Sequence, residues 1–76
     1  MQGFNRITQR AGQMGGRPCI RGLRVTVGMV VGAIASGYSV EQVLEDHPYL
    51  ERDDVFEALR YAAWRAEERE WPMEAA

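Results

Sequence analysis

The stretch TVGMVVGAIASG, residues 26–37, decides the fold, because its apolar side chains recur at the spacing of one helical face. The residues on that face are Val27, Val30, Val31 and Ile34. Thr26 is a residue type that caps the start of a helix, and Gly37 is a type that ends one. The sequence therefore predicts a short helix between these two positions.

Two further helices are predicted after it. Ser39 and Gln42 form a capping box that opens the second helix, and Pro48 requires that helix to stop near position 47. The third helix is predicted over Arg52–Arg69, with Pro72 closing it. Acidic residues at its start suit the helix dipole.

The chain before residue 26 favours extended structure. Segments 4–10, 17–20 and 23–27 read as short strands, and glycines make 11–16 a turn. In an extended chain Arg17, Cys19 and Arg21 share one face, which we expect to point away from the apolar side. The expected layout within one domain is an arm over 1–24, a three-helix body over 25–71 and a tail over 72–76.

Length and composition indicate a single small soluble domain. The 76 residues are 46% hydrophobic and 26% charged, with no apolar run long enough for a bilayer and no apolar core of a signal peptide. Cys19 is the only cysteine and His47 the only histidine, so neither a disulfide nor a Cys/His metal site is expected. Small domains often need such help, and we therefore expect a homodimer or an obligate partner. The cytoplasm is the expected compartment, with no cofactor and no membrane contact.

Charge is divided unevenly along the chain. Residues 1–24 hold five arginines and no acid, a charge of +5, whereas residues 25–76 hold four arginines and eleven acids, a charge of −7. A basic arm on an acidic body predicts either a polyanionic partner or association of arm with body. The candidate DNA-binding residues are Arg6, Arg10, Arg17, Arg21 and Arg24.

The arm arginines also have structural interpretations. Arg21 and Arg24 could pair with acids at the start of the third helix, in the same or the other subunit, and for Arg24 this role is favoured. Those acids are Asp53, Asp54 and Glu57. Phosphate or open solvent is favoured for the three arginines at 6, 10 and 17. Together with Glu51, the same acids argue against placing the start of the third helix in a DNA groove.

A helical wheel predicts the buried face of the third helix. Its core stripe would be Val55, Leu59, Ala62 and Ala66. Tyr61, Trp64 and Trp71 fall on the opposite side, where large aromatic side chains usually mark an interface. The alternative is that Trp64 tucks under the basic arm of its own chain.

An enzyme is not expected. Nothing in the sequence brings Cys19 and His47 within reach of each other, as a nucleophile and its base require. Cys19 is more typical of a small buried hydrophobic residue, and His47 of a turn residue before a proline. The glycines of the 11–16 segment lack the strand and helix that flank a phosphate-binding loop.

The combined pattern of GGRPCIRGLRVTV and GYSVEQVLEDHPYLERDDVFEALRYAA resembles the small prokaryotic family called domain of unknown function 433, over about residues 6–63. The matching positions are Gly16, Pro18, Ile20, Gly22, Arg24, Val27, Gly37, Ser39, Pro48, Leu50, Ala58, Leu59, Tyr61 and Ala62, with Arg21 at a usual basic position. Two departures are Glu51, where Thr or Ser is common, and the segment from Trp64 to Trp71, which lies outside the motif.

The resemblance implies a mainly α, homeodomain-like helix-turn-helix fold with a short N-terminal β element. It also implies an antitoxin-like, VapB-type role beside a PIN-type ribonuclease, and no enzymatic activity. Because PIN-type sites are clusters of carboxylates, arginines with apolar anchors are the candidate toxin contacts. They are Arg60, Tyr61, Trp64, Arg65, Arg69 and Trp71. The alternative function is a stand-alone DNA-binding regulator that uses the basic arm.

Overall fold

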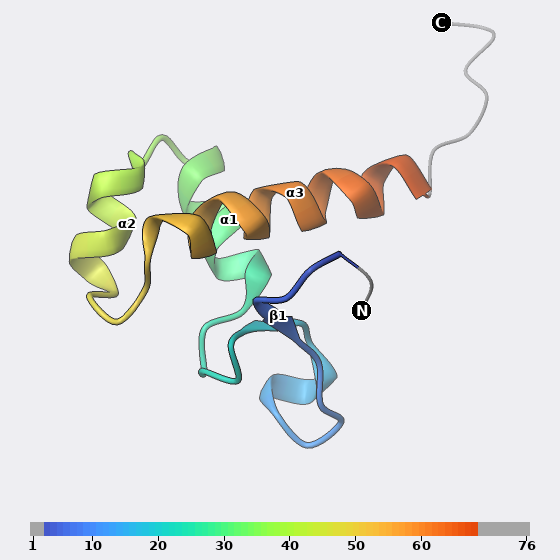
Figure 1. The fold of residues 1–76 in the computed structure, drawn as a ribbon. Helices are drawn as coiled ribbons and strands as arrows, with labels where there is room; N and C mark the ends of the chain where they lie inside the picture. The colour runs from blue at the N-terminus through green and yellow to red at the C-terminus, as the bar shows by residue number, and fades with distance from the viewer. Residues whose placement is uncertain (1–2, 69–76) are drawn as a thin grey trace, which may run out of the picture.

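Three helices form the body of the protein in the computed structural model, which describes residues 3–68 (Figure 1). They are α1 (Val27–Ala35), α2 (Val40–Asp46) and α3 (Arg52–Glu68). The longest, α3, packs against both of the others. The fold is therefore mainly helical, as expected. Within the described residues, no helix has the length and apolar character needed to cross a membrane.

The ends of the helices follow the predicted capping signals. Thr26 accepts a hydrogen bond at 3.0 Å from the backbone N–H three residues later and so caps α1. Ser39 accepts from the backbone N–H of Gln42 at 3.1 Å, and the Gln42 side chain accepts from the backbone N–H of Ser39 at 2.8 Å. Gly37 has φ +105°, a conformation that side chains disfavour, and it separates α1 from α2. The predicted cap and capping box are confirmed.

A short antiparallel hairpin precedes the helices. Strand β1 (Ile7–Thr8) pairs with β2 (Cys19–Ile20), with Ile7 opposite Ile20. Between them lies the one-turn helix η1 (Met14–Gly16). Figure 1 shows the hairpin beside the start of α1 and below α3.

The expected alternation of residues 17–21 was wrong. Cys19 and Ile20 are both buried, although successive residues of a strand should face opposite sides. Cys19 forms a bridge with Thr26 while Ile20 enters the core, so the chain is covered on both sides here. Arg21 has φ +46° and leaves the extended conformation, which ends the alternation.

One hydrophobic core joins the hairpin to the helices. It consists of Ile7, Ile20, Val25, Val27, Val30, Val43, Leu50, Val55, Ala58 and Tyr61. The predicted stripe of α3 was wrong in part, because Ala58 and Tyr61 are buried while Ala66 is exposed. The buried face is rotated toward Asp54 and Glu57, which are also buried beneath the hairpin.

Candidate functional site

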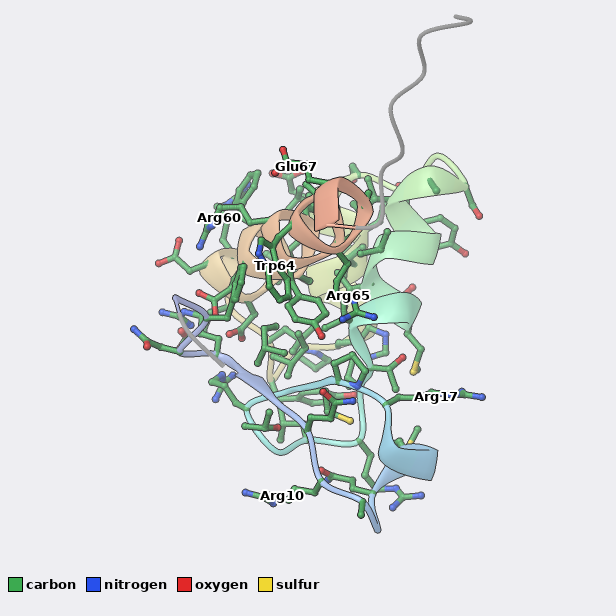
Figure 2. The ribbon with its side chains drawn as sticks, turned by 90° about the vertical axis from the view of Figure 1, so that its right-hand side faces the viewer. Arg10, Arg17, Arg60, Trp64, Arg65 and Glu67 are labelled. Atoms are coloured by element: carbon green, nitrogen blue, oxygen red, sulfur yellow. The ribbon has the colours of Figure 1, made fainter. Side chains whose placement is uncertain are left out.

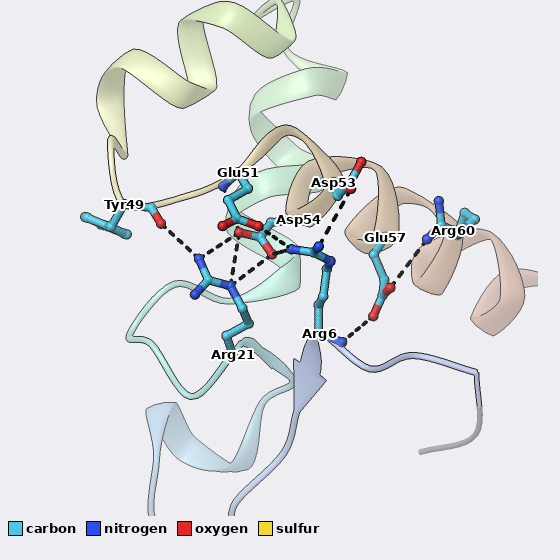
Figure 3. Close-up of polar contacts among 8 residues, drawn as sticks. All are labelled: Arg6, Arg21, Tyr49, Glu51, Asp53, Asp54, Glu57 and Arg60. Carbon is cyan, nitrogen blue, oxygen red and sulfur yellow. Dashed lines mark hydrogen bonds and ion pairs between the residues drawn. The ribbon is translucent and has the colours of Figure 1, made fainter.

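A buried carboxylate at the start of α3 ties the hairpin to the helical body (Figure 3). The Asp54 side chain is 0% exposed. Arg6, which directly precedes β1, donates to it from Nη1 at 2.9 Å. Arg21, which directly follows β2, donates from Nε at 3.1 Å and from Nη2 at 2.9 Å. The backbone N–H of Glu51 adds a hydrogen bond at 2.8 Å. These donors compensate the loss of hydration that burial imposes on the carboxylate.

The pKa shifts of this cluster favour its charged state. Burial raises the pKa of Asp54, but the hydrogen bonds that the carboxylate accepts, those from Arg21 foremost, lower it below its ordinary value. Hydrogen bonds to Glu51 and then to Asp54 raise the pKa of Arg6. The hydrogen bond to Asp54 likewise raises the pKa of Arg21. The cluster is therefore an ion-pair network at neutral pH.

Arg6 extends the network beyond Asp54. Its Nη1 lies 2.7 Å from Glu51 Oε1, and its Nη2 lies 3.7 Å from Asp53 Oδ2. Its backbone N–H donates to Glu57 Oε2 at 2.6 Å. The expectation that Arg6 faces phosphate or open solvent was wrong, because four acidic residues surround it. Arg21 has the structural role that was one of its two interpretations.

Three arginines of the arm remain outside this network. Arg10, Arg17 and Arg24 are exposed, and none forms an ion pair within residues 3–68. Figure 2 shows Arg10 and Arg17 pointing away from the body of the molecule. Within the chain, the acids at the start of α3 do not hold Arg24, and its pairing with the acids of another subunit stays a prediction. The arm therefore presents an uncompensated positive surface.

An aromatic cluster connects the N-terminus to α3. The Phe4 ring lies 5.3 Å from that of Tyr61 and 5.5 Å from that of Trp64, and the latter two rings are 5.7 Å apart. Tyr61 is part of the core, so its predicted position opposite the core was wrong. Trp64 is 38% exposed and lies against the N-terminal segment. Its contact with Phe4 is the intramolecular tuck that was the alternative to an interface.

The second half of α3 extends past the core. The core residues of α3 end at Tyr61, and residues 63–67 are all exposed. Figure 2 views α3 nearly end-on and shows Arg60, Trp64, Arg65 and Glu67 projecting from it in different directions. Arg60 also contacts Glu57 at 3.4 Å. Two predicted toxin contacts, Arg69 and Trp71, lie outside the described residues.

Cys19 and His47 are not brought together. The buried Cys19 Sγ donates to the backbone carbonyl of Arg17, whereas His47 Nδ1 pairs with the Tyr49 hydroxyl at 2.9 Å. Within residues 3–68, no group of three or more His, Cys, Asp or Glu side chains is arranged to hold a metal ion.

The sequence analysis did not single out Phe4, which belongs to the aromatic cluster with Tyr61 and Trp64. An aromatic residue three positions before a strand was the available signal, but no pattern linked it to Tyr61 and Trp64, which lie 57 and 60 residues later in the chain. Asp54 had been proposed as a partner of the arm, but its complete burial was not expected.

Comparison with known proteins identifies the family. Residues 7–62 match the family described as protein of unknown function (DUF433). The uncharacterized protein y4eO of Sinorhizobium fredii is 39% identical over 56 residues, which cover 74% of this chain and 25% of that protein. The chain thus spans about a quarter of the length of this curated relative.

A solved structure has a similar fold. The crystal structure of a DUF433 member protein from Anabaena variabilis superimposes with a TM-score of 0.78 at 28% sequence identity. The match covers 84% of this chain and 63% of that one. The resemblance expected from the sequence motifs is confirmed, and the chain belongs to the DUF433 family.

Proposed function

We propose that this chain is an antitoxin-like protein that binds and neutralises a PIN-type ribonuclease through the outer half of α3. The observation that carries the proposal is the exposure of residues 63–67 on a helix that continues past its own core. Isolated helices shorter than about 12–15 residues are marginally stable in water. The exposed end of α3 would therefore gain stability from a partner that packs on it.

The side chains on this surface suit a protein partner. Trp64 is partly exposed, and its ring lies 5.5 Å from that of Phe4 and 5.7 Å from that of Tyr61. Tryptophan and arginine are the residue types that most often dominate binding energy at interfaces. Arg60 lies one helical turn before Trp64 and contacts Glu57 at 3.4 Å, and arginine is a residue type that recognises carboxylates of a partner well. A nuclease that clusters carboxylates around a metal would present the complementary charge.

Affinity purification tests the proposal directly. The tagged full chain is recovered from the lysate of its source organism after nuclease treatment, and mass spectrometry identifies the proteins bound to it. We expect a PIN-type ribonuclease in a stoichiometric amount, whose activity falls when the chain is added. Recovery of the chain alone would contradict the proposal.

A pair of variants then tests the surface. Trp64→Ala should weaken binding to the purified ribonuclease by about tenfold or more. Tyr38→Ala is the control, because Tyr38 is also an exposed aromatic residue but lies between α1 and α2. Equal affinities for the two variants would exclude this face of α3 as the binding surface.

DNA binding through the arm is a second candidate function. It is supported by the uncompensated Arg10, Arg17 and Arg24. A homeodomain-like helix-turn-helix function of α2 and α3 has less support, since acids crowd the start of α3. Promoter DNA titrated at several salt concentrations tests the arm, where Arg24→Gln should reduce the salt slope by about one and Arg60→Gln should not. Salt-independent binding, or none, would contradict this second function.

A further inference from the structure

The hairpin has one neutralised end and one basic end. At its base, Arg6 and Arg21 bind the Asp54 carboxylate of α3 (Figure 3). At its loop, Arg10 lies two residues after β1 and Arg17 lies two residues before β2. Both are exposed, and neither side chain has a hydrogen bond or an ion pair in the described part of the chain. The loop end of the hairpin therefore carries positive charge that the protein itself does not compensate.

The two loop arginines stand on opposite sides of the hairpin. Thr8 pairs with Cys19, and two residues further along each chain segment are Arg10 and Arg17. Figure 2 shows their side chains pointing in opposite directions. A single small anion cannot reach both guanidinium groups, whereas two phosphates of one polymer can. The arrangement therefore favours a nucleic-acid backbone over free phosphate or a nucleotide.

Hydrogen bonds hold the loop between these arginines in a strained conformation. Met14 in η1 has φ +50°, which residues other than glycine rarely adopt. Gln9 Nε2 donates to the carbonyl of Gly16 at 2.8 Å, and Gln13 Nε2 donates to the carbonyl of Gly22 at 2.7 Å. Strain that the surrounding structure maintains in this way is concentrated at functional sites. A loop fixed before binding also presents its arginines at a lower cost in ordering.

The same hydrogen bonds leave the loop poorly equipped to read bases. Glutamine side chains recognise adenine through its edge in the major groove. Here the NH2 groups of Gln9 and Gln13 bind backbone carbonyls, and Gln13 Oε1 is buried without a partner in the described residues. The other residues of the 11–16 segment are alanine, methionine and glycine. The arginines on its two sides are left for contact, and phosphate contacts fix position without reading sequence.

We propose that the hairpin loop binds the phosphate backbone of duplex DNA without regard to base sequence, with Arg10 and Arg17 on separate phosphates. Arg24 supplies a third contact from the adjacent turn. A Cβ added at Gly22, two residues before Arg24, would lie 3.5 Å from Arg10 Nη1, so this turn lies beside the loop. The inference rests on the second candidate function, DNA binding by the arm, and names its ligand as any duplex rather than one operator.

Fluorescence anisotropy with the full chain tests the proposal. Two labelled duplexes of equal length, one from the region upstream of the gene and one of shuffled sequence, are titrated at salt concentrations from about 50 to 200 mM. We expect their affinities to agree within about threefold, with a log–log salt slope of about −3, because three phosphates are contacted. Arg10→Gln and Arg17→Gln should each reduce the slope by about one.

Arg52→Gln is the matched control. Arg52 is also an exposed arginine, but its Nη2 lies 2.6 Å from Glu41 Oε2, and the substitution removes the same charge from the chain. It should leave the salt slope unchanged, and circular dichroism checks that every variant is folded. A slope that Arg10→Gln and Arg17→Gln leave as steep as Arg52→Gln does would overturn the proposal.

The same titrations separate failure of this inference from failure of DNA binding as such. Binding of the upstream duplex about tenfold or more tightly than the shuffled one would overturn sequence independence and keep the DNA-binding function. Binding of neither duplex would reject both. Inorganic phosphate at equal ionic strength should not displace the duplex, and displacement would show a small-anion site instead. Tighter binding of a duplex RNA of the same sequence would overturn the assignment to DNA.

Discussion

Replacing Asp54 with asparagine removes the charge on which the hairpin and α3 converge. The side chain keeps its size, but one carboxylate oxygen becomes an NH2 group that faces N–H donors. At 0% exposure, water cannot replace the lost hydrogen bonds on the Asp54 side. The substitution thus tests whether this ion network holds the arm in place.

The size of the expected stability loss depends on how exposed Arg6 and Arg21 are. Breaking a fully buried ion pair costs about 3–5 kcal/mol. The Arg6 and Arg21 side chains are 29% and 37% exposed, so both recover part of their hydration when the carboxylate is lost. We therefore expect Asp54→Asn to lower the free energy of unfolding by about 2–3 kcal/mol, a large share of the total of about 4–10 kcal/mol for a chain of this size.

Urea unfolding followed by circular dichroism measures the loss, and its pH dependence identifies the cause. The pKa of Asp54 is lowered in the folded state, so its contribution is present above the unfolded pKa of about 3.9 and is lost as the pH falls below that value through the folded pKa. The wild type should therefore lose more stability than Asp54→Asn as the medium is acidified.

Asp53→Asn is the matched control for this experiment. The Asp53 side chain is 78% exposed and lies 3.7 Å from Arg6, so the change should be within about 0.5 kcal/mol. Equal stabilities of the Asp54 and Asp53 variants at pH 7, with the same acid dependence, would refute the assigned role of the network.

Three further substitutions test the aromatic cluster and the helix ends. Phe4→Ala should lower the free energy of unfolding by about 1–2 kcal/mol and shift the emission of Trp64 to longer wavelengths, measured in a variant with Trp64 as its only tryptophan; an unshifted spectrum would contradict the packing of these rings. Gly37→Ala should cost about 1–2 kcal/mol through φ +105° alone, because a Cβ there meets no atom within 4 Å, and thermal unfolding that matches the wild type would contradict this. Ser39→Ala should cost about 1 kcal/mol in urea unfolding, and no loss would mean that the cap is dispensable.

Local signals in the sequence predicted the helical part of the fold well. Thr26, Gly37 and Ser39 act on neighbouring backbone groups, so their effect can be deduced from a few adjacent residues. The start of α3 at Arg52 was also predicted, since Pro48 closes the preceding helix. These features depend on short-range stereochemistry that tertiary packing did not override.

The candidate site was harder to predict, because its contacts join distant segments. The wheel assigned α3 a buried face from its aliphatic residues, whereas the buried Asp54 and Glu57 rotate that face toward Tyr61. Arg6 and Arg21 beside the hairpin strands, together with the backbone N–H of Glu51, supply the donors that make burial of Asp54 tolerable. The pattern of one helix cannot reveal that its carboxylates pair with Arg6, which lies about 50 residues earlier in the chain.

The distance along the chain between the two sides of the Asp54 network has a consequence for folding kinetics. Arg6 and Asp54 are 48 residues apart, so the hairpin is synthesised long before the carboxylate that anchors it. Strands of two residues are too short to persist alone, and closing so long a loop is slower than forming the local helices. We therefore expect docking of the arm to be a late folding event, so that its contacts govern the rate of unfolding more than the rate of folding.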